Sequence, residues 1–124
     1  MDRVFVEGSP QRDVSAPAQT SVGTTAGLVL FENPKRKGFI VQNTGTTVLK
    51  FTFGATLPTQ TVYHLALKAC TGADDGTGAA YFEASWVGTV NAVSSGAGGT
   101  CVITEIMTGR VDWNVAGDYE LEGI

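Results

Sequence analysis

The sequence is built from short segments in which apolar and polar residues alternate, and this feature constrains its fold more than any other. The clearest segment is 47–53, where Leu49, Phe51 and Phe53 are separated by Lys and Thr. Because successive side chains of an extended strand point to opposite faces, this alternation predicts a strand with one apolar side.

Further segments of this kind follow one another along the chain, separated by turns rich in Gly, Pro and Asn. Segment 61–70 is ambiguous: a strand would turn Tyr63 and Leu65 inward, whereas a helix would align Val62 with Ala69, and its β-branched and aromatic start favours a strand. The Gly-rich segment 94–99 is typical of a hairpin turn. The expected strands are 3–7, 24–31, 39–43, 47–53, 61–70, 81–92 (one strand or a pair) and 100–106, with two shorter ones near Trp113 and Tyr119.

Composition agrees with these segments. Thr, Val and Ile make up 34 of the 124 residues, and 16 more are Gly. β-branched residues favour pleated sheets, so we predict an all-β fold, a single antiparallel β-sandwich or jelly-roll-like domain. We expect residues 1–22 to form an N-terminal strand and an extended arm containing Pro10 and Pro17. Residues 23–108 would form the sandwich, and the acidic tail 109–124 would pack on the same domain or on a neighbour.

Charge is distributed unevenly along the chain. Residues 1–104 have equal numbers of acidic and basic side chains, so the net charge of −4 belongs entirely to residues 105–124. A neutral, charge-poor body is unusual for a free monomer, and we interpret it as a surface covered by other subunits. A Thr-rich β-protein without partners is the alternative. The acidic balance argues against nucleic acid as a partner. The chain also lacks the roughly 20 consecutive apolar residues of a membrane-spanning helix.

Residues with catalytic or ligand-binding chemistry do not form a recognisable motif. His64 lies in a predicted strand and has no GxSxG nucleophile motif to accompany it. Asp74 and Asp75 lack the alternate spacing and distal Glu of a calcium loop. Cys70 and Cys101 are expected to be small buried residues, with a disulfide between neighbouring strands left open. We therefore predict no catalytic residue, no cofactor and no metal, and a protein that is not an enzyme.

Partner contacts are a separate prediction. Lys35, Arg36 and Lys37 form a basic cluster, which either protects a strand edge or meets an acidic partner surface. The acidic tail of another subunit is the natural match for this cluster. Trp113 is the candidate anchor, because tryptophan is enriched at interface hot spots. The predicted contact residues are Lys35, Arg36, Lys37, Asp112, Trp113, Glu120 and Glu122. The aromatic residues also allow a glycan platform, although we expect Trp86 to belong to the core.

Segment 35–106 carries a family resemblance. It contains basic residues followed by GFIVQNTG at 38–45, FG at 53–54, HLAL at 64–67, WVGTVNA at 86–92 and TE at 104–105. In this order, these motifs resemble small β-rich accessory structural proteins of tailed bacteriophages, of the capsid decoration or cement type.

The resemblance implies a function and a set of partners. It implies a non-enzymatic virion protein that binds and stabilises the phage head shell, with the major capsid protein and other copies of itself, in a homotrimer, as partners. It places the protein on the capsid surface, after assembly in the host cytoplasm. The alternatives are a tail, fibre, baseplate or head–tail accessory protein, and a carbohydrate-binding β-sandwich module for host attachment.

Overall fold

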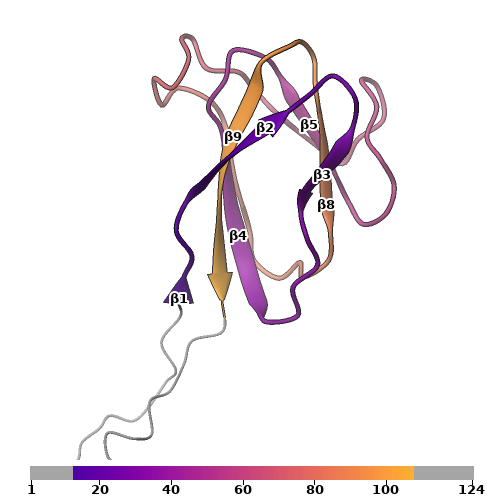
Figure 1. Ribbon diagram of the computed structural model, residues 1–124, viewed down its shortest axis with the longest axis vertical. Coiled ribbons are helices and arrows are strands. Elements are labelled where there is room, and N and C mark those ends of the chain that lie inside the picture. The colour runs from indigo at the N-terminus through magenta and orange to yellow at the C-terminus, as the bar shows by residue number, and fades with distance from the viewer. Residues whose placement is uncertain (1–12, 108–124) are drawn as a thin grey trace, which may run out of the picture.

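Residues 13–107, which the computed structural model describes, form nine β-strands in two antiparallel sheets that pack face to face (Figure 1). This confirms the all-β sandwich that the alternation predicts. The strands are β1 (Asp13–Val14), β2 (Ala18–Val22), β3 (Gly27–Leu30), β4 (Arg36–Asn43), β5 (Leu49–Phe53), β6 (Leu65–Leu67), β7 (Ala80–Glu83), β8 (Val90–Ser94) and β9 (Gly99–Met107).

The strands pair as one long hairpin that is folded over on itself. From the ends of the chain inward, β2 pairs with β9, β3 with β8, β4 with β7 and β5 with β6, all antiparallel. Folding this hairpin gives one sheet in the order β2–β9–β4–β7 and a second in the order β3–β8–β5–β6. Eight strands alternating between two sheets in this way form a jelly roll.

The N-terminal part of the described chain belongs to the sandwich and does not form an arm. β1 and β2 lie one after the other along the same edge of β9, where Asp13 is opposite Met107. Between the two strands, Pro17 has no N–H to contribute to the ladder, so the edge is interrupted there. The expectation of an extended arm is therefore wrong for residues 18–22, and Val22 reaches the core. Residues 1–12 lie outside the described part.

Segment 94–99 connects the two sheets, which corrects its interpretation as a hairpin turn. β8 pairs with β3 and β5, whereas β9 pairs with β1, β2 and β4. The crossing is tight: a Cβ on Gly99 would lie 2.6 Å from both the Ser94 Oγ and the Val22 carbonyl oxygen. Glycine at this position thus permits a close passage of the chain between sheets.

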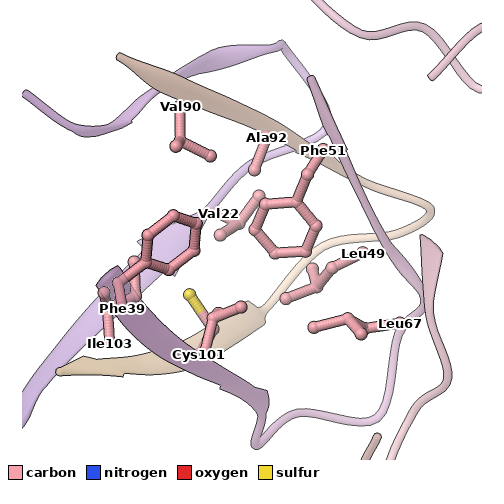
Figure 2. Close-up of a cluster of buried hydrophobic side chains, with 10 residues drawn as sticks. Val22, Phe39, Leu49, Phe51, Leu67, Val90, Ala92, Cys101 and Ile103 are labelled. Carbon is pink, nitrogen blue, oxygen red and sulfur yellow. The ribbon is translucent and has the colours of Figure 1, made fainter. Parts of the chain in front are cut away.

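The core lies between the sheets and receives side chains from both (Figure 2). Leu49 and Phe51 on β5 are fully buried, as the alternation of 47–53 predicts, and Phe53 packs against the same cluster. Each large side chain buried in this way contributes about 1.5–3 kcal/mol. The buried cluster is Val22, Phe39, Val41, Leu49, Phe51, Leu67, Val90, Ala92, Cys101 and Ile103.

The connection 54–64 covers the outer surface of β5 and β8, while Leu28 on β3, on the same side of the sheet, is 43% exposed. Thr52, Asn91 and Val93 point away from the core but are 2%, 6% and 3% exposed. The Asn91 Nδ2 donates to the Gly54 carbonyl oxygen at 2.9 Å, which holds the connection against the strands.

The strand expected over 61–70 is only three residues long. The Thr59 N–H donates to the Val62 carbonyl oxygen, and this turn delays the strand until Leu65. Tyr63, which a strand would turn inward, is 41% exposed. The prediction of an inward-facing Tyr63 is therefore wrong.

Candidate interaction surface

The outer surface of the β2–β9–β4–β7 sheet differs from that of the other sheet, because described residues leave it uncovered. Phe39 and Val41 point into the core, so the intervening Ile40 points outward, opposite Phe82 on β7 and Thr104 on β9. Ile40 is 41% exposed and Phe82 56%. We call this surface the open face; it consists of Val14, Gln19, Ser21, Ile40, Gln42, Ala80, Phe82, Thr100, Val102, Thr104 and Ile106.

The open face carries apolar and neutral polar side chains, and none of its eleven residues is charged. At the end of the face where β1 pairs with β9, Val14 is 64% exposed. Contiguous exposed apolar groups with few charges are typical of the centre of a protein–protein interface. The open face is therefore the candidate functional site of the part of the chain that the structure describes.

A sequence signal for this face exists at 39–41. Three apolar residues in a row cannot all point to the same side of a strand, so one of them must face outward. Such a run is typical of strands that are covered on both sides. The run Ala79 to Phe82 on and before β7 carries the same signal, but the pairing of Phe82 with Ile40 is set by the topology and does not follow from the sequence.

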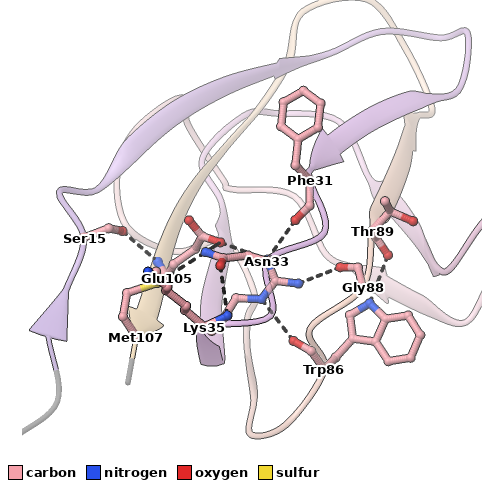
Figure 3. A network of polar contacts seen from close by, with 10 residues as sticks. Ser15, Phe31, Asn33, Lys35, Trp86, Gly88, Thr89, Glu105 and Met107 are labelled. Atoms are coloured by element: carbon pink, nitrogen blue, oxygen red, sulfur yellow. Dashed lines mark hydrogen bonds and ion pairs between the residues drawn. The ribbon is translucent and has the colours of Figure 1, made fainter. Parts of the chain in front are cut away.

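Arg36, one of the predicted partner contacts, is inside the fold. Its guanidinium is 1% exposed and forms an ion pair with Glu105, with 2.8 Å between Nη1 and Oε2 (Figure 3). The same group donates to three backbone carbonyl oxygens, of Phe31 at 3.1 Å, Trp86 at 3.0 Å and Gly88 at 2.6 Å. The prediction that Arg36 contacts a partner is therefore wrong, because the fold already uses its donors.

An irregularity in β4 explains this inward orientation. The register between β4 and β9 shifts between Arg36 and Gly38, so Lys37 is an extra residue on this strand. Lys37 and Lys35 are exposed on either side of the buried Arg36. Their role as partner contacts stays a prediction.

The other predicted contact residues, Asp112, Trp113, Glu120 and Glu122, lie outside the described residues, and their role also stays a prediction. The described chain ends at Met107, which is opposite Asp13 and Arg36. Figure 1 shows the start of β1 and the end of β9 at the same end of the sandwich. The tail therefore begins beside both Lys37 and the Val14–Ile106 end of the open face.

Both cysteines are free and buried, as the sequence predicts. The Cys70 thiol donates to the Asn43 carbonyl oxygen at 3.2 Å. Burial raises the pKa of Cys101 to about 12, so this thiol stays protonated at neutral pH. A protonated, enclosed thiol is a poor nucleophile.

His64 and Asp75 are occupied by local contacts. The exposed His64 accepts a hydrogen bond from the Phe53 N–H at its Nδ1, at 3.0 Å. The Asp75 carboxylate accepts hydrogen bonds from Thr77 and from the Gly72 N–H. Those from Thr77 are the main reason that the pKa of Asp75 is lowered. Within residues 13–107, no group of three or more His, Cys, Asp or Glu side chains is placed to bind a metal.

Two of the aromatic residues considered for a glycan platform, Trp86 and Tyr81, pack against Phe53 and the core. Trp86 stacks on Phe53 with 5.9 Å between ring centroids, and its Nε1 donates to the Thr89 carbonyl oxygen at 2.9 Å. The Tyr81 hydroxyl donates to Glu83 at 2.8 Å, which raises the pKa of Tyr81 and lowers that of Glu83. Trp86 is partly buried against the core, where we expect it from the sequence.

Fold and surface together define a jelly-roll domain with one partly covered and one open sheet face. No family model matches the chain, and no curated protein sequence is similar to it. A solved structure described as "Bacillus endospore appendages form a novel family of disulfide-linked pili" is similar, with a TM-score of 0.50 and 12% sequence identity. The similarity covers 87% of this chain and 97% of the other. It shows that the two chains share a fold. In addition, residues 13–107 include no helix long and apolar enough to cross a membrane.

Proposed function

We propose that this chain is a non-enzymatic structural subunit of a virion, a capsid decoration protein that binds and stabilises the head shell of a tailed phage. The observation that carries the proposal is the open face, an uncharged sheet surface with exposed Ile40 and Phe82. The assignment to phage heads is supported by the sequence resemblance over residues 35–106. The copies of the chain would form a homotrimer on the capsid surface.

Exposure of the open face is unfavourable for a subunit that stays alone in water. Phe82 and Val14 leave 56% and 64% of their surfaces in water, and apolar surface gains about 25 cal/mol for each Å² removed from it. Assembly would recover this free energy. The neutral body of the chain favours the same arrangement, because little repulsion opposes the close approach of many copies.

A filament, such as a tail fibre, is the second candidate, because the similar solved structure is described as belonging to pili. Those pili are described as disulfide-linked. This chain has two cysteines in all, and both are buried and free. Copies of this chain would therefore associate without disulfides between them.

Copy number tests the proposed function. We expect quantitative mass spectrometry of purified virions to find on the order of hundreds of copies per particle, as a symmetric shell requires. A few dozen copies or fewer would refute the capsid role and favour a tail component.

A binding assay with shells that lack the protein tests the surface. The purified chain should bind these shells, and Phe82→Ser should weaken binding. The matched control is Val62→Ser, which changes an apolar residue of 64% exposure on the connection 54–64. Equal binding of the two variants would show that the open face contributes neither to the contact with the shell nor to the assembly of copies that binds the shell.

A further inference from the structure

The open face has a candidate occupant within the chain itself. We propose that it receives residues 111–121 of a neighbouring copy, so that each subunit is joined to the next by its acidic tail. This inference rests on the proposed function, because it names the segment that links subunits of the proposed assembly.

The first support is the position at which the tail begins. Ile106 and Val14 are paired at the end of the open face, and the chain continues past Met107 for another 17 residues. β9 runs toward this end of the sandwich (Figure 1). A segment that continued in this direction would leave its own sandwich, whereas it would have to reverse immediately to reach its own open face.

The second support is the sequence of the tail. In an extended conformation, Val111, Trp113 and Val115 would share one side, and Asp112 and Asn114 the other. The apolar side matches the exposed side chains of the open face. Because this face has no charged residue, docking would leave no charge buried without a partner, and the acidic side of the tail would stay in water.

The third support is size. The open face measures at most about 30 Å along β9 and about 19 Å across four strand positions. This footprint is smaller than the roughly 800 Å² per partner of a typical stable interface, so the face suits a short segment that is one of several contacts. Residues 111–121 would extend over about 37 Å and could cross the whole face.

A tail that docks on the next subunit makes a head-to-tail contact. Contacts of this type close into a ring when the rotation between subunits permits. The exchange is thus compatible with the homotrimer of the proposed function. It adds two contacts to each subunit, one through its own tail and one through its open face.

Cross-linking between two different variants tests the contact. One chain carries Thr104→Cys, at the centre of the open face, and the other carries Val115→Cys in the tail. We expect a short bis-maleimide to join them into a covalent heterodimer when they are mixed. Wild-type protein gives the background, which should be low because Cys70 and Cys101 are buried. Val62→Cys in place of Thr104→Cys is the control and should give only background.

Other occupants give other products. Dimers of the Thr104→Cys chain with itself would indicate that two open faces meet. A cross-link within one chain carrying both changes, in a monomeric fraction, would indicate that the tail covers its own face. Either result, or no cross-link at all, overturns the proposal.

Analytical ultracentrifugation gives a second measurement. Trp113→Ala should weaken self-association at least about thirtyfold, as expected for truncation of an interface hot spot. Val62→Ala should leave it unchanged. Equal association of the two variants would contradict the proposal. Both experiments use the purified chain without phage particles, so they test the tail contact independently of shell binding. The tail contact can be absent from a protein that binds shells, and it can be present in one that does not.

Discussion

Replacing Arg36 with methionine should destabilise the fold more than any other change of a charged residue in the described chain. Methionine retains much of the apolar stem but removes all the donors. Three backbone carbonyl oxygens, those of Phe31, Trp86 and Gly88, would lose a hydrogen bond. Glu105, with 24% of its side chain exposed, would lose its ion-pair partner.

The magnitude follows from these contacts. Each buried acceptor left without a donor costs about 1–3 kcal/mol, and removal of one partner from a buried ion pair costs about 3–5 kcal/mol in all. The two costs are not added, because both describe the loss of the same guanidinium group. Water can also reach the partly exposed Glu105 and replace part of its lost contact. We therefore expect Arg36→Met to lower the free energy of unfolding by about 3–5 kcal/mol.

Urea denaturation at one fixed protein concentration measures this change. The control is Lys37→Met, the same type of change at the adjacent exposed residue, which should alter the free energy of unfolding by less than about 0.5 kcal/mol. Glu105→Gln should fall between them, because the amide oxygen can still accept from Arg36. If the free energies of unfolding of Arg36→Met and Lys37→Met differ by less than about 1 kcal/mol, the hydrogen bonds that Arg36 donates do not stabilise the fold.

Three further predictions concern the core, the sheet crossing and pH, and all three are checked by urea denaturation. Phe51→Ala should cost about 3–5 kcal/mol, because Phe51 is 1% exposed within the core. Gly99→Ala should cost about 1–3 kcal/mol, because the new Cβ would lie 2.6 Å from Ser94 and Val22 atoms; a neutral result would show that the crossing can widen. The free energy of unfolding should fall as pH rises from 9.0 toward 12, by up to about 1.4 kcal/mol per pH unit, because Cys101 ionises earlier in the unfolded chain. Cys101→Ala should reduce this slope and leave the part due to Tyr81, whose pKa is also raised, and an unchanged slope would assign it to groups other than Cys101.

The sequence is sufficient to predict the strands that are buried on one side, because apolar and polar residues alternate along them. Segment 47–53 is the clearest case: Leu49 and Phe51 are apolar because they are buried, and burial at every second residue is what a half-covered strand requires. The jelly-roll class follows from many such strands with turns between them. Pairing partners do not follow, because each turn is compatible with either a hairpin or a crossing. Segment 94–99 shows this, since a Gly-rich turn there joins two sheets.

The orientation of Arg36 could not be predicted for a related reason. With strict alternation, Lys37 would share the inward side with Phe39, and Arg36 would point outward with Ile40. The extra residue in β4 reverses this order, and only the pairing with β9 reveals it. A cluster of three basic residues thus contains two exposed lysines and one buried arginine with different roles.

The folded-over hairpin concentrates contact-forming features at one end of the molecule. Because β1 and β9 are at the two ends of the hairpin, Asp13 and Met107 must lie together, and β4 begins beside them at Arg36. The opposite end of β4 lies at Asn43, next to the self-contained turn 71–77, where the Asp74 N–H donates to the Thr44 carbonyl oxygen. Both ends of the described chain therefore lie at the first end, beside Val14 and Ile106 of the open face. The open face itself runs from this end to Gln42, which donates to Gly76 and Gly78 at the other end. A tail docked as proposed would therefore enter the face of its neighbour at the Val14–Ile106 end or at the end beside turn 71–77.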